Sequence, residues 1–321
     1  MTTSPASATD ADVHPDAPGP RVPAPALVLL AIASVQCGAA IATTLFPYAG
    51  ATGTVLMRLG FSALMLLVAL RPRFWTWPRE SIVAAVTLGL TLGAMNLTFY
   101  LAIRTVPLGV AVTLEFLGPL MVTLVQTRRW RDLAWALLAT AGVALLGLSG
   151  GDTAPVSGMA WALAAGGFWA IYILASARVG RLVPGTDGLA VALAVAALLV
   201  LPFGASGVAG VLDRPAVLLG GVAVAILSSL LPYSLELAAL RHLPTRVFGI
   251  LMSLEPAGGA LAGLLIVGQL LAPTEVLALV LVSVASAGAT LGRRQRAETA
   301  APTDHAVPRP EPEDGADRVT G

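Results

Sequence analysis

The sequence predicts an all-α polytopic membrane protein with ten transmembrane helices, arranged as two inverted five-helix repeats around a central cavity. Three observations support this fold class. The chain of 321 residues is 56% hydrophobic and 12% charged, roughly half the charged share of a soluble domain, and its mean hydropathy is +0.83. The apolar residues come in runs of about twenty, the length that crosses a bilayer core. The chain also resembles itself after a shift of 137 residues.

The apolar part of the chain lies between two polar segments, residues 1–24 and residues 293–321, which are expected to be disordered tails. Short breaks divide the apolar part into ten predicted helices. Their approximate bounds are 25–46, 51–70, 81–103, 107–127, 133–149, 157–179, 187–208, 215–240, 245–268 and 273–291. The seventh run contains Pro202, which is expected to interrupt that helix.

The arginines assign the breaks to the two sides of the membrane. With ten helices, thirteen arginines fall in breaks on one side and two fall on the other. Because cytoplasmic loops carry the excess of basic residues, the arginine-rich side and both tails are expected to be cytoplasmic. The first set is Arg71, Arg73, Arg79, Arg128, Arg129, Arg131, Arg178, Arg181, Arg241, Arg246, Arg293, Arg294 and Arg296, and the second set is Arg104 and Arg214.

Missing residue types exclude several classes of protein. All 19 basic residues are arginine, so neither a Walker A phosphate loop nor a lysine Schiff base can form. The three histidines and Cys37 are scattered, and no zinc site or intrachain disulfide is expected. A net charge of +1 gives no electrostatic reason for a nucleic-acid partner. The HExxH motif is absent as well, so we expect neither an enzyme nor a bound cofactor or metal.

The internal repeat divides the ten helices into two halves, residues 25–149 and residues 157–292. The shift of 137 residues aligns Arg104-Thr-Val-Pro107 with Arg241-His-Leu-Pro244 and Pro119 with Pro256. Because each half has an odd number of helices, the second half enters the membrane upside down. Inverted repeats are typical of secondary transporters, with a binding site between the halves near the bilayer midplane. The alternative is a duplication that only built a helix bundle.

Two carboxylates lie in the middle of predicted helices. Glu115 and Glu255 are each about 13–15 Å into their helices at 1.5 Å per residue. They are candidates for binding an ammonium group or carrying a proton, and the alternative is a packing role. Arg58 is the one basic residue well inside a predicted helix. It could bind a substrate carboxylate, or it could neutralise one of the glutamates.

Other polar and aromatic residues are weaker candidates for the cavity lining. The repeat-equivalent helices 81–103 and 215–240 contribute Asn96, Tyr100, Tyr233 and Glu236, although Glu236 is near a helix end and could simply reach water. The remaining candidates are Gln36, Trp169 and Tyr172. A lone Gln can also merely join two helices by hydrogen bonds.

Small residues and prolines make further local predictions. The pairs Gly89–Gly93 and Gly259–Gly263 predict close helix packing, inside the protein rather than in a dimer. Pro119 and Pro256 predict breaks in the helical hydrogen bonds directly after the two glutamates.

Four segments of the chain resemble a known family. They are ASVQCGAAIATTLFP, NLTFYLAIRTVPLGVAVTLEFLGPL, FWAIYILASARVG and LPYSLELAALRHLPTRVFGILMSLEPA. They are similar, nearly in series, to the threonine/homoserine exporters of the EamA group in the drug/metabolite transporter superfamily. The resemblance covers residues 25–292. The family usually has Glu at the position of Gln269, so the resemblance carries no coupling role to this residue.

The resemblance implies a ten-helix bacterial inner-membrane protein that exports threonine, homoserine and related small amino acids, coupled to the proton gradient. Under this hypothesis Glu115 or Glu255 binds the ammonium group, Arg58 with Asn96 binds the carboxylate, and the tyrosines form walls. The expected partners are an amino-acid substrate and the lipid bilayer, and a homodimer is left open. The alternatives are export of other small metabolites or drugs, and a non-transporting membrane binding or scaffold protein.

Overall fold

The computed structural model describes residues 23–127, 130–149, 155–183, 185–240, 242–243 and 245–300. Within these ranges all regular secondary structure is helical. Of the predicted tails, residues 1–22 and 301–321 lie outside the described residues, whereas residues 293–300 are helical rather than disordered. The last helix is longer than predicted, because α12 runs from Pro273 to Ala300.

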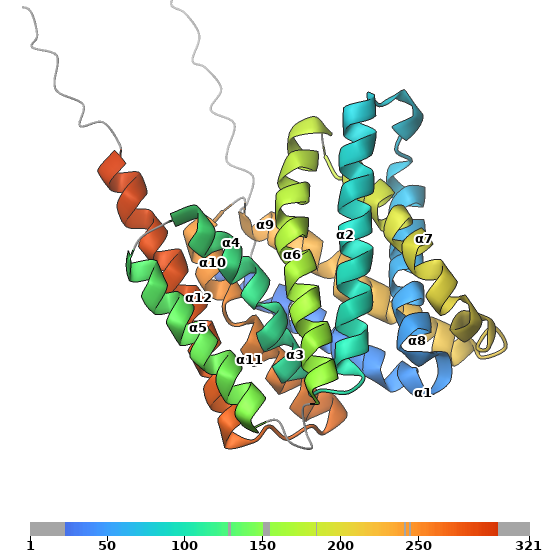
Figure 1. The fold of residues 1–321 in the computed structure, drawn as a ribbon. Coiled ribbons are helices and arrows are strands. Elements are labelled where there is room, and N and C mark those ends of the chain that lie inside the picture. The colour runs from blue at the N-terminus through green and yellow to red at the C-terminus, as the bar shows by residue number, and fades with distance from the viewer. Residues whose placement is uncertain are drawn as a thin grey trace, which may run out of the picture.

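The first two predicted helices form one continuous element, α1 (Ala24–Leu70), of 47 residues. A straight helix of this length would span about 70 Å, more than twice the bilayer core. Gly50 interrupts it with φ +68° and ψ 167°, a backbone conformation that glycine adopts without the steric cost of a Cβ atom. Figure 1 shows the two arms of α1 running in different directions from this point.

Several predicted helices appear as single elements with nearly the predicted bounds. A short 3₁₀ turn, η1, follows α1. This turn spans Phe74–Thr76 and was not predicted. The predicted helices that appear as single elements are α2 (Arg79–Ile103), α5 (Trp130–Ser149), α6 (Val156–Leu182) and α7 (Asp187–Ala209). The expected interruption at Pro202 is wrong, since α7 continues through this residue.

Three other predicted helices are divided into shorter segments. Residues 107–127 form α3 (Leu108–Glu115) and α4 (Leu117–Thr127). Residues 215–240 form α8 (Pro215–Ala225), the π-helical η2 (Ile226–Leu230) and α9 (Leu231–Leu240). Residues 245–268 form α10 (Thr245–Met252), α11 (Glu255–Ala262) and the π-helical η3 (Gly263–Val267). Three of these breaks precede a proline, Pro119, Pro232 or Pro256, whose missing N–H leaves an upstream carbonyl without its helical partner. The predicted break after Glu115 is confirmed, whereas the break near Pro256 lies before Glu255 rather than after it as predicted. No proline lies close to the change from α11 to η3.

Seven helices in the described part of the chain are long and apolar enough to cross a membrane. They are α1, α2, α6, α7, the α8–α9 segment, the α10–η3 segment and α12. Two shorter apolar helices lie at Leu108–Val122 and Leu133–Leu146. The chain is therefore an all-helical protein with several membrane spans, and the count of ten stays a prediction.

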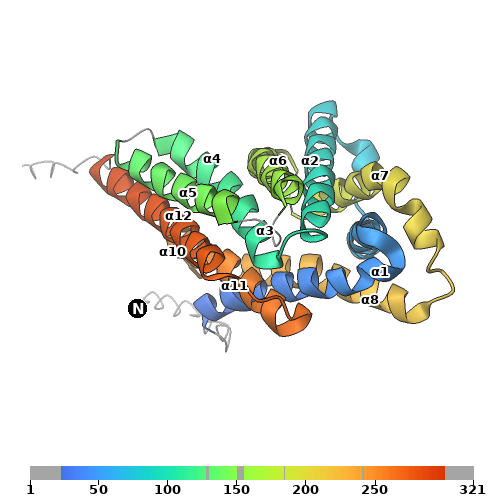
Figure 2. The ribbon, with the colours of Figure 1, turned by 60° about the horizontal axis from the view of Figure 1, so that its bottom comes forward.

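Helices from the two predicted halves pack directly on one another. α1 packs on α7, α8 and α9, α2 packs on α6 and α7, α3 packs on α11, and α5 packs on α12. Figures 1 and 2 show α5 and α12 side by side at one side of the molecule, with α2, α6 and α7 at the other. The α3–α11 pair lies between these groups.

Glycines allow these close approaches. Gly89 and Gly93 of α2 lie against the backbone of Ala192 and Ala196 of α7. Gly259 of α11 lies against Val112 of α3, and Gly263 lies against Leu108 and Gln269. The predicted packing of both glycine pairs inside the protein is confirmed.

Candidate functional site

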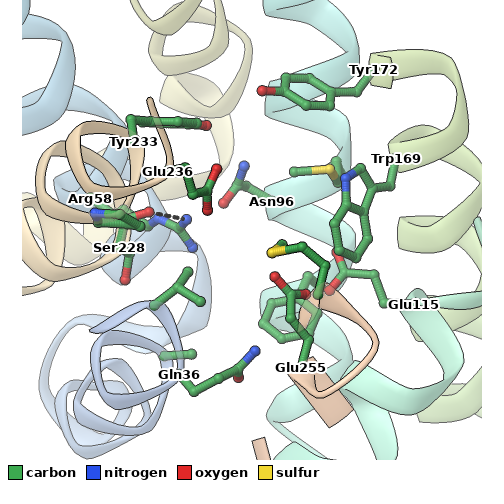
Figure 3. Close-up of a pocket in the computed structure, with 16 residues that line it drawn as sticks. Gln36, Arg58, Asn96, Glu115, Trp169, Tyr172, Ser228, Tyr233, Glu236 and Glu255 are labelled. Carbon is green, nitrogen blue, oxygen red and sulfur yellow. Dashed lines mark hydrogen bonds between the residues drawn. The ribbon is translucent and has the colours of Figure 1, made fainter. Parts of the chain in front are cut away.

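A cavity of about 220 Å³ lies between the two predicted halves of the chain. Nine of the ten residues that we proposed from the sequence line it, and Figure 3 shows them around one space. These nine are Gln36, Arg58, Asn96, Glu115, Trp169, Tyr172, Tyr233, Glu236 and Glu255. They come from α1, α2, α3, α6, α9 and α11, so the tertiary fold collects residues that are up to 219 positions apart in the sequence.

Arg58 is anchored on one side of the cavity. Its Nη2 donates a hydrogen bond of 3.0 Å to the carbonyl oxygen of Ser228. That carbonyl is available because Pro232, four residues later, has no N–H to donate. Ser228 lies in η2, and π-helical turns are frequent at functional sites. Arg58 also lines the cavity, where the Nη N–H groups outside this bond can meet a ligand.

Tyr100 packs against Arg58 and, unlike the other nine candidates, does not line the cavity. The Arg58 guanidinium carbon is 5.7 Å from the centre of the Tyr100 ring, within cation–π range. Tyr100 is fully buried, and its hydroxyl has no hydrogen-bond partner among the described residues. The structure therefore places Tyr100 as a support for Arg58.

Glu115 and Glu255 lie at the two helix breaks on the opposite side of the cavity from Arg58 (Figure 3). Glu115 is the last residue of α3, and Glu255 is the first residue of α11. They are only 9% and 7% exposed. The helix dipole stabilises an anion at the N-terminus of a helix, so the position of Glu255 offsets part of the cost of burying a carboxylate.

The three glutamates of the cavity do not pair with Arg58. Within the described residues, no salt bridge joins Arg58 to Glu115, Glu236 or Glu255. The alternative in which Arg58 neutralises Glu115 or Glu255 is therefore not what this conformation shows. The cavity holds one guanidinium and three carboxylates whose charges are not matched by direct contacts.

Two amides add polar groups to the cavity. Asn96 is buried, and its Nδ2 donates to the Leu92 carbonyl at 2.9 Å, which leaves its Oδ1 as an acceptor. Gln36 is also buried, and its Oε1 has no partner among the described residues. Gln36 thus joins no described helices through this oxygen, which lies beside Gly259, and in Figure 3 the amide nitrogen of Gln36 is the atom that points toward the cavity.

Aromatic side chains and Glu236 form the less buried part of the cavity. Trp169 and Tyr172 come from α6, and Tyr233 and Glu236 come from α9; all four are partly exposed. In Figure 3 the hydroxyl ends of Tyr172 and Tyr233 point toward one another across the cavity. Trp169 packs edge-on against Phe116, with ring centres 5.6 Å apart. The cavity therefore has a polar, buried end and an aromatic, more open end.

The sequence interpretation missed seven lining residues, of which six are apolar. Val35, Ala39, Met95, Phe99, Pro232, Met252 and Ser228 complete the lining. Apolar residues in a membrane helix carry no signal that separates cavity from lipid. Ser228 had a detectable signal, because a proline four residues downstream frees its carbonyl oxygen.

Comparison with known proteins agrees with this architecture. The model of the EamA-like transporter family matches residues 156–291. One crystal structure aligns with a TM-score of 0.53 at 22% identity, covering 84% of this chain and 98% of its own; it supports the fold alone.

Two relatives match nearly the whole chain. "Threonine/homoserine exporter RhtA" of Escherichia coli (strain K12) is 44% identical over 274 residues, which are 85% of this chain and 92% of the relative. The protein of the same name from Salmonella typhimurium (strain SL1344) is 44% identical over 274 residues, 84% of this chain and 92% of the relative. At this identity and coverage, the chain belongs to the EamA-like transporter family, whose members here are exporters rather than enzymes, within the group of RhtA relatives.

Proposed function

We propose that this protein is a secondary exporter of small neutral amino acids, with threonine and homoserine as substrates, and that it works by alternating access coupled to protons. The substrate class follows the printed names of its relatives. The observation that carries the proposal is the charge arrangement of the cavity, with Arg58 facing Glu115 and Glu255.

This charge arrangement suits a zwitterion. A carboxylate group can accept hydrogen bonds from the free N–H groups of Arg58, and charge-assisted bonds of this kind are the strong ones. An ammonium group can donate to Glu115 or Glu255 on the opposite side. Asn96 Oδ1 is an acceptor for a remaining N–H or hydroxyl proton of the substrate.

The size of the cavity supports a small substrate over a drug. Sites for drug-sized ligands hold roughly 300 Å³ or more, whereas this cavity holds about 220 Å³. Its apolar lining, with Met95, Phe99 and Met252 among others, suits a short aliphatic side chain.

An excess of negative charge supports proton coupling. Three carboxylates and one guanidinium line the cavity, and a bound zwitterion leaves the excess of two negative charges unchanged. Uncompensated charge is costly in a low-dielectric interior, so protons are the simplest counter-ions. In the proposed cycle, a carboxylate binds the ammonium group from the cytoplasm, releases it outside when it takes up a proton, and returns protonated.

The membrane arrangement is part of the proposal. We propose ten spans in two inverted repeats, residues 25–149 and 157–292, with both termini in the cytoplasm. The two arms of α1, the short apolar helices at 108–122 and 133–146, and the other six spans together give ten. The pairing of α3 with α11 and of α5 with α12 supports the repeat, since these pairs are equivalent helices of the two halves.

The test is efflux of radiolabelled threonine from proteoliposomes that contain the purified protein, with and without an imposed pH gradient. We expect gradient-driven flux that is lost in Glu255→Gln and kept in the matched variant Glu80→Gln, whose side chain is 71% exposed. Flux that survives in Glu255→Gln would assign the proton or the ammonium group to Glu115. No threonine flux under any gradient would reject the amino-acid substrate.

A further inference from the structure

The cavity is open at one end and closed at the other. Tyr172, Tyr233 and Glu236, which lie toward the arginine-rich end of their helices, are partly exposed. Asn96 and Glu115, which lie toward the opposite end, are buried. In the proposed topology this conformation faces the cytoplasm, and the closed end faces outward.

Backbone contacts between the two halves seal the closed end. A Cβ atom on Gly109 of α3 would stand 2.8 Å from the Cα of Ala260 of α11. Likewise, a Cβ atom on Gly53 of α1 would stand 3.1 Å from the Cα of Gly207 of α7. A methyl group would clash at Gly109 and would be tightly packed at Gly53, so the helix backbones are in close contact and a ligand can pass between them only if they separate.

One side chain bridges the halves at this end. The Oε1 of Gln269 accepts a hydrogen bond of 2.9 Å from the backbone N–H of Leu108, the first residue of α3. Pro107 precedes Leu108, and the first N–H groups of a helix have no partner within the helix. Gln269 thus caps a helix that belongs to the other half of the chain.

The backbone around Gln269 is arranged for this contact. η3 ends at Val267, and the following Gly268, with a φ of +76°, turns the chain back. The Gln269 N–H then donates a hydrogen bond of 3.0 Å to the carbonyl of Gly263. A Cβ atom on Gly263 would stand 2.9 Å from the Gln269 Oε1. Gly268 therefore provides the turn, and Gly263 the space without a Cβ atom, that let the Gln269 side chain reach α3.

We infer that Gln269 is a positioning residue of the transport site: it fixes α3, and with it Glu115, against α11 and Glu255 while the outer end is closed, and its bond to Leu108 opens when the cavity turns outward. This inference rests on the proposed alternating access. An amide oxygen carries no charge, so the contact does not itself depend on protonation. A carboxylate at this position would also accept the N–H and would gain from the helix dipole.

Accessibility of the cavity from outside tests the inference. The background is Cys37→Ser, which removes the one cysteine, and the reporter is Met95→Cys in the cavity lining. A membrane-impermeant thiol reagent is applied to right-side-out vesicles. Loss of a helix cap shifts a two-state equilibrium by roughly fivefold, so Gln269→Ala should raise the labelling rate about fivefold. Gln269→Asn, which is too short to reach Leu108, should do the same.

Two control variants separate this role from general loosening. Gln269→Glu should label at the unmodified rate or more slowly, because the carboxylate keeps the contact with Leu108 and gains from the helix dipole. Leu270→Ala changes the neighbouring residue, which is 80% exposed, and should also label at the unmodified rate. Unchanged labelling in Gln269→Ala, or an equal rise in Leu270→Ala, would overturn the inference. Raised labelling without any threonine flux would support the role of Gln269 and reject the proposed substrate.

Discussion

Arg58 has two fixed contacts, and they restrict where its free N–H groups can point. The Ser228 carbonyl accepts from Nη2, and the Tyr100 ring lies 5.7 Å from the guanidinium carbon. Its Nε is buried without a partner among the described residues. A planar guanidinium held in this way can keep its anchor and still present N–H groups to a carboxylate, whereas an ammonium group has no equivalent fork.

We therefore predict that Arg58→Lys does not preserve transport. A lost charge-assisted hydrogen bond costs about 1.5–3 kcal/mol, so the KM for threonine should rise by about tenfold or more in proteoliposome efflux. The matched control is Arg178→Lys, on an exposed side chain whose salt bridge to Glu80 spans 3.5 Å, and it should leave the KM unchanged. A wild-type KM in Arg58→Lys would show that charge alone suffices at this position.

At the scale of helices, a proline decides whether the Ser228 carbonyl is available to Arg58. Pro232→Ala would restore an N–H that competes for this carbonyl, and the Arg58 anchor would weaken. A neutral hydrogen bond contributes about 1 kcal/mol, so we expect the KM for threonine to rise roughly fivefold. The control is Pro202→Ala in α7, an exposed residue outside the cavity lining. Equal effects of both substitutions would mean that the anchor is irrelevant to binding.

Two adjacent glycines of α6, one packed and one facing open space, allow a matched test of the packing of α6 against α3. A Cβ atom at Gly166 would stand 2.6 Å from the backbone oxygen of Glu115, whereas a Cβ atom at Gly167 meets nothing within 4 Å. We predict that Gly166→Ala displaces the end of α3, lowers the melting temperature and reduces threonine flux. Gly167→Ala should be neutral or raise the melting temperature slightly, because Ala favours helix by up to about 1 kcal/mol. Thermal unfolding in detergent measures both, and similar melting temperatures would argue against this close packing.

The breaks within helices show what the sequence can and cannot predict. Apolar runs of membrane length predict helices well, and the bounds of α2 and α7 differ from prediction by two residues or fewer. Prolines are ambiguous, because a membrane helix can tolerate the loss of one hydrogen bond. The helix continues at Pro202, yet it breaks near Pro119 and Pro256. The π-helical segments η2 and η3 have no periodicity that distinguishes them from α-helix.

The polar residues of the cavity could be predicted from the sequence, but its apolar lining could not. Charged and amide side chains are costly in lipid, so Glu115, Glu255, Arg58 and Asn96 stand out in the sequence. Tyr100 and Tyr233 look alike in the sequence, since each is a tyrosine within an apolar helix. Only the fold shows that Tyr233 lines the cavity, whereas Tyr100 packs against Arg58 outside the lining. The apolar lining could not be predicted, because lipid and cavity select the same residue types.

At the scale of the whole molecule, two side-chain contacts bring together helix ends that are distant in the sequence. The Arg214 guanidinium carbon lies 5.7 Å from the centre of the Tyr48 ring, so the bend in α1 and the α7–α8 loop share one end. At the other end, the Glu80–Arg178 salt bridge joins α2 to α6. The first end has few arginines and the second has many, as the positive-inside rule requires of opposite sides of a membrane.

We predict that these two ends face opposite sides of the membrane, with the bend at Gly50 outside. In the Cys37→Ser background, Tyr48→Cys and Asp213→Cys should react with an impermeant thiol reagent added to intact cells. Trp75→Cys and Thr186→Cys should react only after permeabilisation. All four positions are exposed, so a missing signal cannot be ascribed to burial in the protein. Labelling of Tyr48→Cys and Trp75→Cys from the same side would show that the second arm of α1 does not cross the membrane. Because the arm between them carries Arg58, that result would also remove the residue proposed to bind the substrate carboxylate from the membrane interior.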